Sequence, residues 1–259
     1  MKPILVCETY VATSGIDDRK NKRANHLLLL AENMTGWHNL MKLISIANTN
    51  GFWYKPRIEH KFLEEYHEGI IASSACLAGE IPQKILSGDI EGAVEIAEYY
   101  DGTMGRGNFF LEVMPNTLDE QKKVNEAIID ISRRTGIPMI ATCDSHYLNR
   151  DDYDWHKILL RINTHADPTD DAFGFDRNEF YLMSPEEMYE KFGDTIPDAL
   201  TNTVEISERC NVKIIPEHRK YLLPETNLGD GMTPDDELRK RAHDGLKARF
   251  EARGTEIPE

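Results

Sequence analysis

The sequence has no Cys-x-x-Cys pair, no apolar run long enough to span a membrane and no signal-peptide layout at its N-terminus. Its four cysteines are scattered, and three of them lie inside apolar, strand-like runs: Cys7, Cys76, Cys143 and Cys210. Scattered cysteines of this kind are typical of reduced thiols and argue against a disulfide framework. We therefore expect a cytoplasmic protein that does not contact a membrane.

Positive charge is also scarce. The 259 residues include 30 Lys and Arg against 45 Asp and Glu, which gives a net charge of -15. This balance argues against a surface that grips nucleic acid by bulk electrostatics. It does not exclude a nuclease, because a bound metal ion can supply positive charge locally. The length suits one large domain with an appendage.

Apolar runs alternate with helix-periodic segments along most of the chain, which predicts a parallel α/β architecture. From Cys210 onward the pattern loosens, and Thr233 to Phe250 is a capped, charged helix that we expect to begin a second module. The expected strands are 3–11, 26–31, 69–74, 109–113 and 179–182, and the expected helices are 36–48, 58–66, 81–87, 89–100, 118–134, 151–163 and one capped by Ser184 with Pro185 and Glu187.

The most informative stretch is 136–147, where an apolar run ends in Asp144 and His146. Alternate residues of a strand point the same way, so we expect both side chains to project together from the carboxyl end of a buried strand. A carboxylate and an imidazole placed in this way are natural ligands for a divalent cation. The alternative is that Asp144 caps the next helix and His146 is an ordinary loop histidine.

Other apolar runs also carry a metal-capable residue: Glu8, His26 and Cys76 lie in or just beyond three of them. Recurrence at successive strands favours a common site, because an α/β barrel brings strand ends together around one axis. Each residue alone has an ordinary alternative. Glu8 could be a surface carboxylate, His26 a hydrogen-bonded core histidine and Cys76 a small buried hydrophobe.

Several motifs in their order resemble the polymerase and histidinol phosphatase (PHP) domain, as it occurs in the alpha subunit of bacterial DNA polymerase III. They are Cys7–Val11, His26–Asn33, Gly51–Ile58, Ala141–Tyr147, and Phe180–Leu182 with Glu186–Met188. The resemblance implies a seven-stranded α/β barrel that binds up to three metal ions. It implies Glu8, His26, Cys76, Asp144 and His146 as metal ligands, with Glu8, Asp144 and His146 also catalytic. A thiolate beside an imidazole favours zinc, while the carboxylates leave manganese or magnesium open.

The family also begins with a His-x-His strand, and this sequence contains no His-x-His. We therefore expect residues 1–214 to be a PHP domain without its N-terminal strands. The resemblance makes residues 215–259 a linker and the start of the polymerase palm. The chain ends before the palm's catalytic aspartates, so we expect it to be inactive in polymerisation by itself.

The function implied by the resemblance is part of a DNA-directed DNA polymerase in replication, a nucleotidyltransferase whose PHP domain has metal-dependent phosphoesterase or 3'-5' exonuclease potential. Its partners would be DNA, through the full-length polymerase, and other replicase subunits. Two alternatives stay open: an inactive scaffold domain, and an unrelated metal-dependent hydrolase barrel. In the second case the aromatic and basic loop Trp53–Arg57 would line a pocket, unless it is simply a packing loop.

Overall fold

The computed structural model describes residues 2–165, 177–214, 228 and 231–256. By its internal contacts the chain divides into two units, Met1–Ile214 and Ile215–Glu259. The first unit contains the sheet and helices α1 to α8, and the second contains helix α9 (Pro234–Arg253). The polar segment that we expect after the helix at 151–163, running through Gly174, and the loosened stretch between Ile214 and Thr233 lie mostly outside the described residues.

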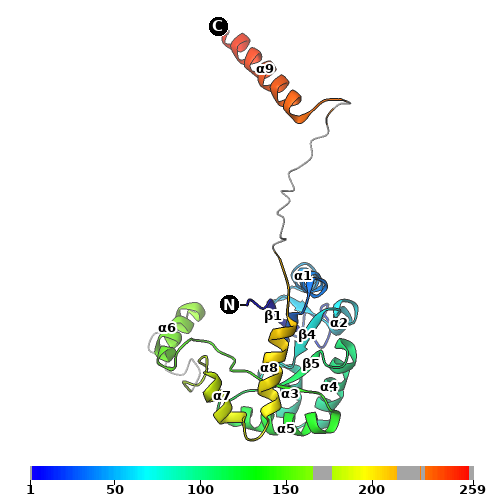
Figure 1. The fold of residues 1–259 in the computed structure, drawn as a ribbon, viewed down its shortest axis with the longest axis vertical. Helices are drawn as coiled ribbons and strands as arrows, with labels where there is room; N and C mark the ends of the chain where they lie inside the picture. The colour runs from blue at the N-terminus through cyan, green and yellow to red at the C-terminus, as the bar shows by residue number, and fades with distance from the viewer. Residues whose placement is uncertain (1, 166–176, 215–227, 229–230, 257–259) are drawn as a thin grey trace. The chain divides into compact units, whose positions relative to one another are not determined.

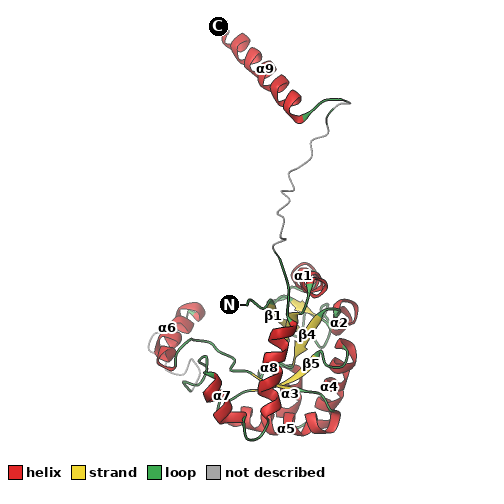
Figure 2. Cartoon of the chain, viewed as in Figure 1, coloured by secondary structure: helices red, strands yellow, loops and turns green. Residues whose placement is uncertain are grey.

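A mixed six-stranded sheet forms the centre of the first unit (Figure 2). Its order is β3-β1-β2-β4-β5-β6. The α/β class is as predicted, whereas a seventh strand and closure into a barrel stay predictions. The strands are β1 (Val6–Val11), β2 (Asn25–Ala31), β3 (Arg57–Ile58), β4 (Ile70–Ser73), β5 (Phe109–Val113) and β6 (Met139–Ala141).

The prediction of a parallel α/β architecture was wrong for β2, which runs antiparallel to both β1 and β4. The remaining pairs, β1 with β3, β4 with β5 and β5 with β6, are parallel. The reason is the connection between β1 and β2, because the described residues 12–24 form no helix and a chain without a crossover returns antiparallel.

Helices cover both faces of the sheet (Figure 1). On one face, Phe109 and Leu111 of β5 join the main core with helices α1 to α5. On the other face, Phe110 packs in a smaller cluster with Ile206 of helix α8 (Pro197–Arg209), a helix that we did not predict. The other bounds are α1 (Met34–Thr49), α2 (His60–Tyr66), α3 (Glu80–Leu86), α4 (Ile90–Met104) and α5 (Asp119–Thr135).

The chain after β6 differs from the expected long strand. Strand β6 ends at Ala141, and Asp144 has a φ of 47°, a left-handed conformation that no strand residue adopts. The expected strand at 179–182 is reduced to a single bridge between Tyr147 and Tyr181. Asp144 is not a helix cap, since Asn149 caps the following 3-10 turn η1 (Arg150–Asp152) before helix α6 (Tyr153–Thr164).

The predicted helix caps are confirmed in both units. Ser184 and Glu187 form a capping box at helix α7 (Pro185–Phe192), with proline in its first turn. Thr233 and Asp236 form another at helix α9. No described helix is long and apolar enough to cross a membrane.

Candidate metal centre

Glu8 and His26 come together because β1 and β2 are antiparallel. Glu8 pairs with Leu28 and Tyr10 pairs with His26, so Glu8 and His26 are diagonal neighbours on one face of the sheet. His26 Nδ1 donates to Glu8 Oε1 at 2.7 Å. We expected these residues at the ends of successive strands. Instead, Glu8 lies within β1 and His26 lies near the start of β2.

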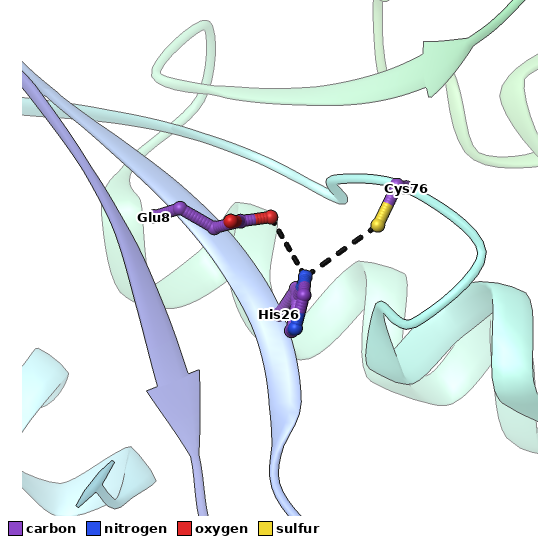
Figure 3. A group of neighbouring side chains, drawn as sticks. All are labelled: Glu8, His26 and Cys76. Carbon is purple, nitrogen blue, oxygen red and sulfur yellow. Dashed lines mark hydrogen bonds and ion pairs between the residues drawn. The ribbon is translucent and has the colours of Figure 1, made fainter. Parts of the chain in front are cut away.

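Cys76 completes a three-residue group. It lies in the turn between β4 and α3, and its Sγ is 3.5 Å from His26 Nδ1 (Figure 3). One ligand atom from each of Glu8, His26 and Cys76 lies within 4.8 Å of the other two. The preceding residue, Ala75, has a φ of 58°, and this tight turn places the thiol opposite the two strands.

Without an ion in the site, this group favours a protonated imidazole. Hydrogen bonds with Cys76 and Glu8 raise the pKa of His26 to about 10, although partial burial opposes the increase. A metal ion would have to displace the proton from Nδ1, because only a neutral imidazole nitrogen is a ligand. The same atoms that hold the proton are therefore arranged to hold a cation.

Asp144 and His146 form a second pair close to the first group. His146 Nε2 lies 3.6 Å from Asp144 Oδ1. The hydrogen bond with Asp144 raises the pKa of His146, and the negative charges of Asp144 and Glu8 act in the same direction. The ring of His146 also lies beside His156 of α6, with a centroid separation of 5.7 Å. The loop after β6 therefore presents these side chains without the strand geometry that we expected.

A cavity of about 260 Å³ joins the two groups. It is lined by Glu8, Cys76 and Asp144, together with two further polar residues, Glu112 and Thr142. His26 and His146 are not among the residues that line it. The predicted ligands thus divide into two sets, the group of Glu8, His26 and Cys76 and the pair of Asp144 and His146.

Glu112 was missed by the sequence analysis. It is only 4% exposed, near the end of β5, and accepts hydrogen bonds from Ser73 Oγ at 2.5 Å and from Thr142 Oγ1. Burial raises the pKa of Glu112, and the charge of Asp144 adds to this, while the two hydroxyl groups oppose it. The only signal in the sequence was a single charge within the apolar run 109–113.

The donor atoms suit a divalent cation. Glu8, His26 and Cys76 offer one oxygen, one nitrogen and one sulfur, the three atom types that zinc binds in proteins. A thiolate donor disfavours magnesium, whereas carboxylates accept several divalent ions. The residues present therefore fit a zinc-type ion, and Glu8, His26 and Cys76 are the ones that would hold it.

Comparison with known proteins gives two kinds of match. Residues 1–116 match the family model described as "PHP domain". The chain is also similar to curated proteins named DNA polymerase III subunit alpha. It is 41% identical over 219 residues to that of Treponema pallidum, which covers 83% of this chain and 19% of the relative.

Two further relatives with the same name match almost all of the chain. Identity is 37% over 268 residues for Thermus aquaticus and 36% over 267 residues for Deinococcus radiodurans. Each match covers 99% of this chain, but 22% and 20% of the respective relative. The chain thus spans about a fifth of the length of the curated relatives it matches.

Proposed function

Because residues 1–116 belong to the PHP domain family and most of the chain is similar to DNA polymerase III alpha subunits, we propose that it works within a replicative DNA polymerase. In this proposal its PHP domain holds a divalent metal ion, zinc in the first place, and hydrolyses phosphodiesters as a 3'-5' exonuclease does. DNA and other replicase subunits in the cytoplasm are its partners.

The observation that carries the proposal is the convergence of Glu8, His26 and Cys76. Three different ligand types from β1, β2 and the turn after β4 approach within 4.8 Å of one another. A carboxylate, an imidazole and a thiol at one point supply three protein ligands, the number found in a zinc site with an open position. A divalent ion held there would supply positive charge and Lewis acidity for phosphoester hydrolysis.

Asp144 and His146 have roles in proton transfer and substrate binding. Asp144 lines the same cavity as Glu8 and holds the imidazole of His146 by its hydrogen bond. This bond keeps His146 protonated to higher pH than a free histidine, so the imidazolium can donate a proton to a leaving oxygen. We assign two roles to Asp144. It orients His146, and it helps to hold the divalent metal ions that accompany the substrate.

The first experiment is zinc analysis of the chain and of Cys76→Ala. We expect about one zinc ion per chain and its loss in the variant, because two remaining protein ligands are too few for a stable site. Binding at neutral pH should release protons, since His26 is protonated in the metal-free chain and has a pKa of about 10. Calorimetry in two buffers of different ionisation enthalpy measures that release.

The control for zinc analysis is Cys143→Ala. Cys143 is also half-buried, but its sulfur contacts Met188 and it is not part of the three-residue group. This variant should keep its zinc. Metal-free wild-type protein after purification with zinc present, or equal zinc in both variants, would contradict the proposed site.

A second candidate function is a scaffold without catalysis. The observation in its favour is that the ion pairs Glu8 with His26 and Asp144 with His146 satisfy these side chains without a metal. Release of nucleotides from the 3' end of a single-stranded oligonucleotide distinguishes the two. Zinc-dependent release that is lost in Asp144→Asn supports the enzyme, and zinc binding without release supports the scaffold.

A further inference from the structure

A cluster of basic residues interrupts this acidic chain beside the candidate metal centre. Four of the five residues at positions 19–23 are Lys or Arg, in a chain with a net charge of -15. The segment lies in the connection between β1 and β2, which leads directly to His26. The metal site described above uses none of these cations, so their concentration here needs another explanation.

Arg57 fixes the backbone of this segment by hydrogen bonds. It is fully buried and its guanidinium donates to the carbonyl oxygens of Ile16, Asp18, Asn21 and Gly51. Its partners are therefore two loops, the basic connection 12–24 and the aromatic loop before β3. Such a buried anchor holds the basic segment in one conformation, and a preorganised segment loses less entropy when it binds a ligand.

The two loops meet at a cavity of about 490 Å³. Lys22 and Arg23 line it from the basic segment, Lys55 lines it from the aromatic loop, and none of its lining residues is acidic. His26 is also part of the wall, so the cavity directly adjoins the group of Glu8, His26 and Cys76. Three cations without a carboxylate make this cavity an anion site, which we call the basic pocket.

Aromatic rings accompany the cations. Lys55 Nζ donates to Tyr10 OH at 3.2 Å and lies 4.8 Å from the centre of that ring. Lys22 Nζ lies 4.2 Å from the centre of the Tyr54 ring, which is 61% exposed. Cations beside exposed rings are the pattern by which proteins hold the phosphates and stack the bases of single-stranded nucleic acid.

We propose that the basic pocket binds a backbone phosphate of a single-stranded polynucleotide through Lys22, Arg23 and Lys55, with a neighbouring base on Tyr54. The anion site follows from the cations and the cavity, whereas the choice of a polynucleotide rests on the function proposed above. The strand bound here would lie beside His26, and therefore beside the metal ligands.

The test is fluorescence anisotropy of a labelled oligo-dT strand with the full chain in a low-salt buffer that contains EDTA. We expect saturable binding, weakened about tenfold in Lys22→Ala/Lys55→Ala because two phosphate contacts are lost. The dependence of log K on log salt should become shallower by up to about 0.7, the slope for one neutralised phosphate of a single strand. The charge-conserving Lys22→Arg/Lys55→Arg should retain binding.

The matched control is Lys42→Ala. Lys42 also lies over a tyrosine ring, with its Nζ 5.0 Å from the centre of Tyr66, but on helix α1 away from the basic pocket. This variant should bind as the wild type does. Unchanged binding in the double variant, an equal loss in Lys42→Ala or no binding by the wild type would overturn the proposal.

Two further experiments identify the ligand and test the basic pocket independently of the metal site. Inorganic phosphate or thymidine monophosphate that binds as tightly as the oligonucleotide would refute the polynucleotide assignment. Cys76→Ala should lose zinc but keep oligonucleotide binding, because Cys76 does not line the basic pocket. Failure of the metal site therefore leaves this result intact, and failure of the basic pocket leaves zinc binding intact.

Discussion

Replacing Glu112 by glutamine tests the energetic cost of the buried carboxyl in the candidate site. Glu112 is on β5, almost without solvent exposure, and its two oxygens accept from Ser73 and Thr142. Glutamine has the same shape. Its carbonyl can accept from one hydroxyl, and its amide can donate to the other after that hydroxyl rotates. The substitution therefore removes the ionisable group and keeps the packing.

The expected effect depends on pH. Burial raises the folded-state pKa of Glu112 above its ordinary value of 4.5. The stability that the protonated carboxyl contributes is therefore fully present below that value and is lost as pH rises through the folded-state pKa. Glu112→Gln has no such loss. Its stability relative to the wild type should increase with pH by about 1.4 kcal/mol for each unit of pKa shift.

Thermal unfolding in EDTA, followed by circular dichroism from about pH 5 to about pH 8, measures this difference. A domain of this size should gain about 2–4 °C in Tm per kcal/mol. Glu190→Gln is the control, because Glu190 is exposed on α7 and its charge is solvated in both states. A Tm difference between Glu112→Gln and wild type that stays constant or shrinks as pH rises would refute the reasoning.

Two further substitutions test the structural anchors. Arg57→Met should lower the free energy of unfolding by about 3 kcal/mol in urea denaturation, because it leaves four carbonyl oxygens without their donor. A loss below about 1 kcal/mol would show that water replaces the guanidinium. Ser184→Ala should cost about 1 kcal/mol by the same measurement through loss of the α7 capping box, whereas Ser184→Thr should keep most of it.

Most elements of the fold could be predicted from the sequence because their signals are local. Helix α5 shows its apolar stripe and ends at Gly136, whose φ of 75° suits glycine, and the capping box of α7 is visible in the letters themselves. The antiparallel direction of β2 and the early end of β6 were not predicted. Both depend on pairing with distant segments, and residue periodicity carries no information on strand direction.

The sequence named three residues of the candidate site but not their arrangement. Glu8, His26 and Cys76 are brought together, but by a diagonal contact between antiparallel strands and a turn, instead of by successive strand ends. Glu112 was overlooked because a charged residue in a run of five buried positions gives no sign of the hydroxyl groups that donate hydrogen bonds to it. Those partners, Ser73 and Thr142, come from two other segments.

The net charge argued against a surface that grips nucleic acid by bulk electrostatics, yet the structure gathers positive side chains in one pocket. The net charge of -15 belongs to the whole chain, and at physiological salt a charge acts over about 8–10 Å. The wall of the basic pocket carries Lys22, Arg23 and Lys55 and no carboxylate, so a phosphate that has reached it contacts positive side chains. Beside the metal centre the sign of the charge is reversed, because Glu8, Cys76 and Asp144 are placed there to attract a cation. A polyanion and its metal ion would thus find adjacent sites of opposite sign, and His26 is the residue that both sites share.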